Sequence, residues 1–482
     1  MFTIFQNASP YAYDIEAVDE IFQSGKTVDQ FIIGNEVHRG GMATLKEAFL
    51  SGEESHSILL KIPRVGRDQP VDNLICFETE LTILKAIKSP YVPRFIKGGN
   101  LAKNPYIAME KIEGFSLEKV INEKKQLSID QSIVISLNLL KAIQDLHAQE
   151  VIHLDLKPDN ILINENNDVF IIDFGLAHHM RFPDLLAEEM RKGIGSAPYI
   201  SPEQIVGVRE DVRSDIFSFG VILYEMLTGE LPFDNPQTLN GLKKRFWAQP
   251  TPPRAIRSEI PLWLQEIILR CLEPFAKDRY QSATHIRQLI KEPSSIKLTE
   301  RSERIRPLSA WKSIKRWLKV AGYEPSPILR SEVIHEQAPL MVAAIDVSGD
   351  NQQMFERMQR AASNIMRVFP EGRISCIGVI LSTPTFEGER ETDSASGQFR
   401  GYLVRLMDWA KPLNMSVELI SFHVFESLDP ASKIVEFAKD NDAAIILIGA
   451  SRFIPNRVVP WRSIMTKVVE EAHCSVHVVR MQ

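Results

Sequence analysis

The chain has 482 residues, of which 44% are hydrophobic and 24% charged, so it is long enough for several domains and has the composition of a soluble globular protein. Its net charge of -6 gives no indication of a nucleic acid-binding surface. The N-terminus has no signal-peptide pattern, no apolar run is long enough to cross a bilayer, and the four cysteines are widely spaced, so we expect a cytoplasmic protein.

The first part of the chain changes from a stretch without motifs to alternating strand and helix patterns. Residues 1–30 are predicted to be a loosely attached N-terminal lead-in. The elements expected after them are, in order, strands at 31–34, 45–50 and 57–62, a helix at 74–87, a strand near 106–110 and a long amphipathic helix at 128–149. A glycine-containing turn at 38–45 joins the first two strands.

The run His153-Leu154-Asp155-Leu156-Lys157-Pro158-Asp159-Asn160, followed by Asp173-Phe174-Gly175, contains the groups that phosphoryl transfer needs. Asp155 is placed to accept the proton of an attacking hydroxyl, and Lys157 to steady the transferred group. Asn160 and Asp173 offer the hard oxygen ligands that Mg²⁺ prefers. The run resembles the catalytic loop and metal-binding motif of the eukaryotic-like (bacterial type) Ser/Thr protein kinases. The resemblance implies an α+β two-lobed protein kinase fold at 31–292, with an N-lobe at 31–113 and a C-lobe at 114–292.

The resemblance also implies phosphate-binding residues in the N-lobe. Gly40 matches the middle glycine of the hairpin that covers the phosphates in kinases, with His38 and Ala43 at the outer glycine positions and Leu45 at the valine position. A plain β-turn is the alternative for this hairpin taken alone. Lys61 matches the lysine that holds the α- and β-phosphates of ATP.

Further N-lobe residues are assigned by the same resemblance. Leu59 replaces a small alanine and would tighten the roof over the adenine. Glu80 is the preferred partner of Lys61, with Glu78 as the alternative. Met109 would be the gatekeeper, and backbone groups from Glu110 to Ile112 would meet the adenine edge.

The segment from Asp173 to Glu203 is predicted to be the activation segment, and it departs from the family pattern in two ways. Leu154 stands where most regulated kinases have an arginine, and no Ser, Thr or Tyr lies between Phe174 and Gly195. We therefore expect activity that does not depend on phosphorylation of this segment. Ser196, in place of the family threonine, favours Ser/Thr over Tyr substrates.

Three further expectations concern the C-lobe. Glu203 is predicted to form a buried ion pair with Arg279, and Asp215 to anchor the backbone of the catalytic loop, as in the family. The adjacent His178 and His179 are predicted to be a solvated loop feature, since no further metal ligands lie near them in the sequence.

Residues 293–338 are predicted to be a linker that contains a basic amphipathic helix. Trp311, Ile314 and Trp317 fall on one side of the helix, and lysine and arginine residues lie on the other. The segment 301–320 either lies on an anionic membrane surface or packs its tryptophans on a neighbouring domain. We favour packing, because only one short helix is involved and no lipidation motif accompanies it.

Residues 339–482 alternate apolar strands with helices, which predicts an α/β domain with a parallel sheet covered on both faces. Asp346 and Gly449 end two strands, where ligands of such sheets bind. The pattern resembles the universal stress protein family. ATP-binding members of that family carry a glycine motif that lets the triphosphate approach the backbone. Its positions are occupied here by Gly449, Arg452, Arg462 and Ser463, so two of the three glycines are replaced by arginine, and we expect no ATP binding of that kind. The resemblance also implies a homodimer through the 476–481 region.

Taken together, the sequence predicts an ATP- and Mg²⁺-dependent Ser/Thr protein kinase that acts on protein substrates in stress signalling. The alternative is a non-enzymatic, nucleotide-binding scaffold that acts through its C-terminal domain. The altered residues His38, Ala43 and Leu59 favour the scaffold, whereas six retained chemical positions favour the enzyme: Lys61, Glu80, Asp155, Lys157, Asn160 and Asp173.

Overall fold

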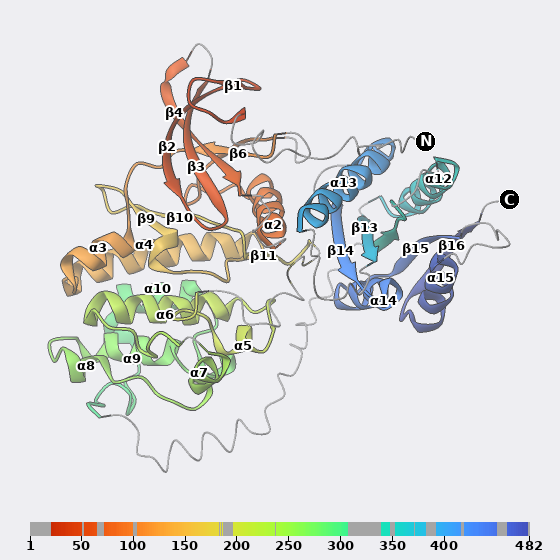
Figure 1. The fold of residues 1–482 in the computed structure, drawn as a ribbon. Helices are drawn as coiled ribbons and strands as arrows, with labels where there is room; N and C mark the ends of the chain where they lie inside the picture. Colours follow the sequence, from red (N-terminus) through yellow and green to blue (C-terminus); the bar gives the residue numbers. More distant parts are fainter. Residues whose placement is uncertain are drawn as a thin grey trace. The chain divides into compact units, whose positions relative to one another are not determined.

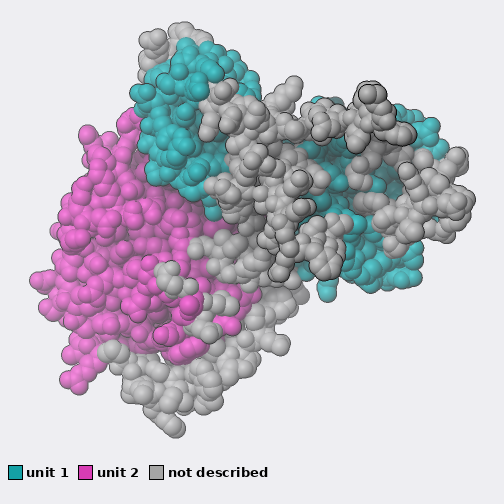
Figure 2. All heavy atoms as spheres, viewed as in Figure 1, with its two compact units in different colours: residues 1–74, 97–108, 334–482 teal, residues 75–96, 109–333 magenta. Residues whose placement is uncertain are grey.

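The computed structural model describes residues 21–50, 53–64, 72–99, 104–182, 184, 186, 196–236, 238–306, 339–347, 352–370, 372–381, 392–415, 419–450 and 460–480. The chain divides into two compact units, which are coloured separately in Figure 2. The first unit comprises residues 1–74, 97–108 and 334–482, and the second comprises residues 75–96 and 109–333.

A six-stranded antiparallel sheet, with the strand order β1-β2-β3-β4-β6-β5, forms the N-terminal lobe (Figure 1). Its strands are β1 (Thr27–Val28), β2 (Phe31–Arg39), β3 (Ala43–Leu50), β4 (Glu53–Pro63), β5 (Phe95–Gly98) and β6 (Ile107–Glu110). The predicted lead-in therefore ends too late, because Val28 pairs with Phe31 and both Phe22 and Val28 are buried. Their apolar side chains complete the sheet's core, which places residues 21–30 in the lobe.

The second unit is mainly helical. It contains most of α2 (Asp72–Ala86) and all of α3 (Leu117–Lys124), α4 (Ile129–Ala148), α5 (Pro202–Ile205), α6 (Arg213–Thr228), α7 (Leu239–Lys243), α8 (Pro253–Ile256), α9 (Leu262–Cys271) and α10 (Ala283–Lys291). Almost every side chain of α6 is buried, and α4 and α9 pack against it. The predicted helix at 128–149 is confirmed as α4, whose first turn is capped by the Ser128 hydroxyl accepting the Gln131 N–H.

Short strands flank the segment from His153 to Asn160, which is the predicted catalytic loop. They are β7 (Phe115–Ser116), β8 (Val151–Ile152), β9 (Ile161–Ile163), β10 (Val169–Ile171) and β11 (His178–His179). The strands β10, β9 and β7 form one small sheet, and β11 pairs with β8 in another. The predicted catalytic loop lies between β8 and β9, and a strand ladder holds each of its ends.

The predicted linker begins too early, because residues 293–306 pack on the C-lobe. The Thr299 hydroxyl donates to Glu266, and Arg301 forms ion pairs with Glu266 (3.3 Å) and Glu273 (3.0 Å). These contacts fix part of the basic run, so Arg301 does not lie on a freely exposed helix face. The predicted helix that carries Trp311 lies outside the described residues.

The C-terminal domain contains a five-stranded parallel sheet, as predicted, in the order β14-β13-β12-β15-β16. Its strands are β12 (Leu340–Ala344), β13 (Arg373–Leu381), β14 (Ile420–Ser427), β15 (Ile445–Ala450) and β16 (Ser475–Arg480). Four helices cover it: α12 (Gln352–Val368), α13 (Thr392–Ala410), α14 (Pro430–Asp440) and α15 (Pro460–Glu471).

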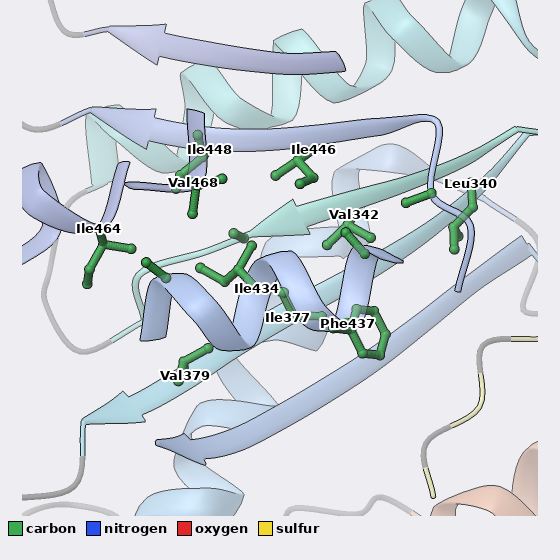
Figure 3. Packing of buried hydrophobic residues seen from close by; sticks show 14 residues of the cluster. Leu340, Val342, Ile377, Val379, Ile434, Phe437, Ile446, Ile448, Ile464 and Val468 are labelled. Atoms are coloured by element: carbon green, nitrogen blue, oxygen red, sulfur yellow. The ribbon is translucent and has the colours of Figure 1, made fainter. Parts of the chain in front are cut away.

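Alternate side chains of each strand face different helices. Ile434 and Phe437 of α14 and Val468 of α15 pack on one face of the sheet, against strand residues that Figure 3 shows at close range. Burial of each such side chain contributes roughly 1.5–3 kcal/mol. Gly449 faces α12 instead, where an added Cβ would lie 3.0 Å from Sδ of Met354. Helix packing therefore favours a small residue at this position, independently of any ligand.

A buried polar chain interrupts the apolar packing under α14. His423 is 3% exposed, its Nε2 lies 2.7 Å from Oγ of Ser421, and that oxygen lies 3.0 Å from Oγ of Ser375. The ring also packs on Phe437, with 5.1 Å between the ring centres. Burial lowers the pKa of His423 to about 3. The side chain is therefore neutral in the folded domain at physiological pH.

We expect the C-terminal domain to lose about 2 kcal/mol of unfolding free energy between pH 7 and pH 5 through His423. In this range the unfolded histidine takes up a proton while the folded one does not. The unfolded state thus binds more protons, and stability falls as the pH falls. Urea-dependent hydrogen exchange of β13 and β14 peptides, corrected for intrinsic rates, measures the effect.

His423→Gln should lose this pH dependence, whereas His473→Gln, which changes an exposed histidine, should keep it. The same pH dependence in both variants would contradict the assignment.

Within the described ranges, no helix combines the length and apolar composition needed to span a bilayer. All four cysteines are free thiols.

Candidate active site

The Asp155 carboxylate is held in one orientation by hydrogen bonds from three directions. Its Oδ2 accepts a hydrogen bond from Nδ2 of Asn160 (3.1 Å) and lies 3.0 Å from Nζ of Lys157. Its Oδ1 accepts the backbone N–H of Ser196 (3.1 Å). The side chain is 9% exposed, so a small part of it remains accessible. This arrangement leaves a fixed carboxylate that can accept one more proton from a bound hydroxyl.

Lys157 bridges the catalytic loop and the activation segment. Its Nζ donates to Oγ of Ser196 at 2.8 Å and to Asp155. Partial burial opposes the charge of Lys157, but its pKa is raised, because Asp155, Asp173 and Asp159 stabilise the ammonium ion. Lys157 is therefore a permanent positive charge beside the carboxylate.

Asp215 of α6 anchors the catalytic loop, as predicted. Its carboxylate accepts the backbone N–H groups of His153 and Leu154, each at 3.0 Å. Leu154 has a positive φ of 61°, a left-handed conformation that costs energy in a leucine and that these bonds maintain. Burial opposes the charge of Asp215, yet its pKa is lowered, mainly by the hydrogen bond with His147. No pattern in the sequence marks His147 for this role, because its partner lies far along the chain.

Asn160 and Asp173, the predicted metal ligands, belong to neighbouring backbone segments. Asn160 ends the short helix η1 (Pro158–Asn160), and its backbone oxygen accepts the N–H of Ile172 at 3.0 Å. The His153 ring lies 3.1 Å from the oxygen of Ile172 and edge-on to Phe174. Asp173 is close enough to Lys157 to raise its pKa. The segment of Asp173 is thus tied to the catalytic loop.

The donor set fits a divalent cation. The Asn160 amide nitrogen donates to both the backbone oxygen and the carboxylate of Asp155, which turns the amide oxygen away from Asp155. That oxygen and the Asp173 carboxylate are hard ligands of the type that Mg²⁺ binds.

Four of the predicted nucleotide-binding residues share one face of the N-lobe sheet. In the β3–β4 register Leu45 lies opposite Lys61, and Ala43 lies opposite Pro63. Because side chains alternate along a strand, Leu59 falls on the same face as Lys61. The intervening residues Leu60 and Ile62 are buried on the other face. The sheet therefore presents Ala43, Leu45, Leu59 and Lys61 together.

The predicted phosphate-covering turn is a tight hairpin between β2 and β3. The Gly40 N–H donates to the oxygen of Ala43 at 3.0 Å. Arg64 closes the hairpin from β4, since its N–H donates to the oxygen of Met42 (2.8 Å) and its Nη1 to the oxygen of Gly40 (2.9 Å). Sequence reasoning missed Arg64, because nothing in its neighbourhood marks it as a partner of the turn.

The remaining predicted nucleotide-binding residues belong to the second unit. Glu80 of α2 is 2% exposed, and Met109 at the end of β6 is 6% exposed. The Glu110 side chain is exposed, and its N–H donates to the oxygen of Arg94 at 3.0 Å, while Ile112 is half-buried. Lys61 and Glu80 fall in different units, so their ion pair stays a prediction.

The predicted ion pair of Glu203 and Arg279 is present and buried. Nη1 and Nη2 of Arg279 donate to the two carboxylate oxygens of Glu203 at 2.6 and 2.8 Å. A second buried arginine, Arg245, donates to the backbone oxygens of Ala197 and Ile200 and thereby fixes the end of the activation segment. The sequence did not point to Arg245, whose partners are backbone atoms.

The prediction that His178 is solvated is wrong. His178 is 5% exposed, because β11 pairs with β8 and carries it into the lobe, where its Nδ1 lies 3.6 Å from Oδ2 of Asp184. Burial lowers its pKa. Among the described residues, no group of three or more His, Cys, Asp or Glu side chains is arranged to hold a metal ion.

Comparison with known proteins shows that residues 32–293 match the protein kinase domain family. A probable serine/threonine-protein kinase of Clostridium acetobutylicum is 29% identical over 269 residues, which are 56% of this chain and 40% of that protein. One of Clostridium perfringens is 33% identical over 229 residues, 47% of this chain and 33% of that protein. The serine/threonine-protein kinase PknB of Mycolicibacterium smegmatis is 33% identical over 183 residues, 38% of this chain and 29% of that protein. The chain thus spans less than half the length of each of these relatives.

Proposed function

The chain belongs to the protein kinase family, and from this premise we propose that it is an ATP-dependent Ser/Thr protein kinase that phosphorylates protein hydroxyl groups. The observation that carries the proposal is the Asp155 carboxylate, which is oriented by Asn160 and the Ser196 N–H and lies beside the Lys157 ammonium. A base and a cation in this arrangement match the chemistry of hydroxyl phosphorylation.

In the proposed reaction Asp155 accepts the proton of a Ser or Thr hydroxyl as that oxygen attacks the γ-phosphorus of ATP. The new O–P bond forms while the bond from phosphorus to the ADP oxygen breaks, and ADP leaves. Lys157 remains protonated and stabilises the charge of the transferred group. Its hydrogen bond to Ser196 supports a role for this cation beside a bound substrate hydroxyl.

We propose that Mg²⁺ is the metal that this chain uses, and that the Asn160 amide oxygen and the Asp173 carboxylate would hold it. When bound, it would neutralise charge on the ATP phosphates. We assign the phosphates themselves to the sheet face of Ala43, Leu45 and Lys61 under the Gly40 hairpin, and the adenine to Leu59, Met109, Glu110 and Ile112. Glu80 would orient Lys61 by an ion pair.

The proposal predicts phosphate transfer from labelled ATP to a generic basic protein. Phosphoserine and phosphothreonine, but no phosphotyrosine, should appear on amino-acid analysis, because Lys157 and Ser196 occupy positions that favour Ser/Thr over Tyr substrates in the resemblance to Ser/Thr kinases. EDTA should abolish transfer, and added Mg²⁺ should restore it. A folded preparation that transfers no phosphate with ATP and Mg²⁺, to itself or to any protein, would end the proposal.

We propose that the C-terminal domain is universal stress protein-like and links the kinase to stress signalling in the cytoplasm. The parallel sheet supports the resemblance, and the packing of Gly449 under α12 supports a domain without the family's ATP site. Photo-crosslinking of azido-ATP to residues beyond 339 would contradict the absence of an ATP site.

We also propose a homodimer through β16, one of the two edge strands of the described sheet. Sedimentation equilibrium of the full chain tests it, and a monomer would contradict it.

A further inference from the structure

An ion pair outside the catalytic cluster ties the activation segment to the C-lobe. Arg209, between α5 and α6, is 3% exposed, and its Nε donates to Oδ2 of Asp184 at 2.5 Å. Asp184 lies within the activation segment. Nη2 of the same guanidinium donates to the backbone oxygens of Leu176 (3.1 Å) and Ala177 (3.5 Å). One cation therefore holds the start and the middle of the segment.

Asp184 is also fixed through its neighbour Leu186, which packs in the lobe. Its Oδ1 accepts the N–H of Leu186 at 3.1 Å, and the Leu186 side chain is buried in a cluster with Cys76. Burial opposes the ionisation of Asp184, but its pKa is lowered, because Arg209 and His178 stabilise the carboxylate. Asp184 is thus a fixed negative charge at neutral pH.

The Asp184–Arg209 ion pair resembles the phosphate–arginine pair that phosphorylation creates in other activation segments. A phosphate on an activation segment orders it by placing a negative charge opposite an arginine. Here a carboxylate stands opposite a guanidinium, and both groups are encoded in the sequence. The segment has no Ser, Thr or Tyr between Phe174 and Gly195, and Leu154 occupies the position of the usual phosphate-binding arginine.

We propose that the Asp184–Arg209 ion pair is a built-in substitute for phosphorylation of the activation segment. Both side chains act as positioning residues, and the inference rests on the proposed kinase activity. The same segment contains Ser196, which donates its N–H to Asp155 and accepts a hydrogen bond from Lys157. Loosening the segment therefore disturbs the receiving site for the substrate.

The first test compares the full-length Asp184→Asn variant with the wild type, using a generic basic protein as substrate. We expect kcat/KM for the protein to fall at least tenfold, mostly through KM, while KM for ATP stays within about twofold. Hydrogen exchange of peptides over 174–186 should become faster. Glu210→Gln, which changes an exposed carboxylate next to Arg209, should match the wild type. Wild-type kinetics and exchange in Asp184→Asn would overturn the inference.

A second variant separates the positioning role from loss of folding. Asp184→Asn leaves Arg209 buried without its counter-charge, which is destabilising by itself. The double variant Asp184→Asn/Arg209→Gln removes both charges and should regain thermal stability, yet keep the raised KM for the protein. Asp184→Glu, which keeps the carboxylate, should retain at least a third of the wild-type kcat/KM. A stable double variant with wild-type kinetics would overturn the inference.

Phosphatase treatment distinguishes this inference from the proposed function. Treated wild-type protein should keep full activity, because the negative charge belongs to Asp184. Loss of activity on treatment, or an essential phosphate found on Ser196 by mass spectrometry, would overturn the substitution. If the wild type transfers no phosphate at all, the proposed function fails and the inference falls with it. If the wild type is active and Asp184→Asn is equally active, only the inference fails.

Discussion

Asp155→Asn is expected to lower kcat by a factor of about 10²–10⁴ while the protein stays folded. The amide keeps one oxygen to accept the Ser196 N–H, so the loop should remain close to its native conformation. It cannot take up the proton of the substrate hydroxyl, and its own N–H groups face the Lys157 ammonium and the Asn160 amide. Initial-rate measurements with labelled ATP and a generic basic protein check the prediction.

The matched control is Asp130→Asn, which changes an exposed carboxylate in the first turn of α4. It should leave kcat within about twofold of the wild type. Nucleotide binding by Asp155→Asn should stay within about threefold, because the base does not hold ATP. Equal kcat for wild type and Asp155→Asn would remove Asp155 from the role of base and favour the scaffold interpretation of the chain.

The parts of the site that the sequence predicted well are local. Asp155, Lys157 and Asn160 lie in one continuous run, and their contacts with one another follow from a loop of a few residues. The shared face of Leu59 and Lys61 follows from strand alternation. The parallel sheet of the C-terminal domain was predictable for a similar reason, since buried strands are continuous apolar runs.

The parts that the sequence did not predict depend on packing between distant segments. Pro293, Ser294 and Ser295 have the composition of a linker, yet the chain continues along the C-lobe because Arg301 meets Glu266 and Glu273. His178 stands next to another histidine and outside any periodic pattern of apolar residues, so the sequence does not indicate that it is buried. The pairing of β11 with β8 buries it. The partners of Asp184 and of Asp215 are likewise distant in the chain. Such pairs carry no pattern that one sequence reveals.

The buried pair of Arg279 and Glu203 carries the largest expected effect on stability. Arg279 is 1% exposed and Glu203 is 7% exposed. Besides the carboxylate, Arg279 donates to the backbone oxygens of Glu273 (2.7 Å), Pro274 (3.0 Å) and Arg213 (2.9 Å). The guanidinium thus joins the Glu273–Pro274 backbone and the start of α6 to Glu203 at the end of the activation segment.

Arg279→Met is expected to lower the free energy of unfolding of the C-lobe by about 3–5 kcal/mol, because it leaves the Glu203 carboxylate buried without its counter-charge. Glu203→Gln should cost less, since the backbone oxygens still accept hydrogen bonds from Arg279. Urea-dependent hydrogen exchange of α6 and α9 peptides measures both. Arg181→Met, which breaks an exposed ion pair with Glu150, should cost at most about 1 kcal/mol. If Arg279→Met costs no more than Arg181→Met, the Glu203–Arg279 pair does not stabilise the lobe, which would contradict the prediction.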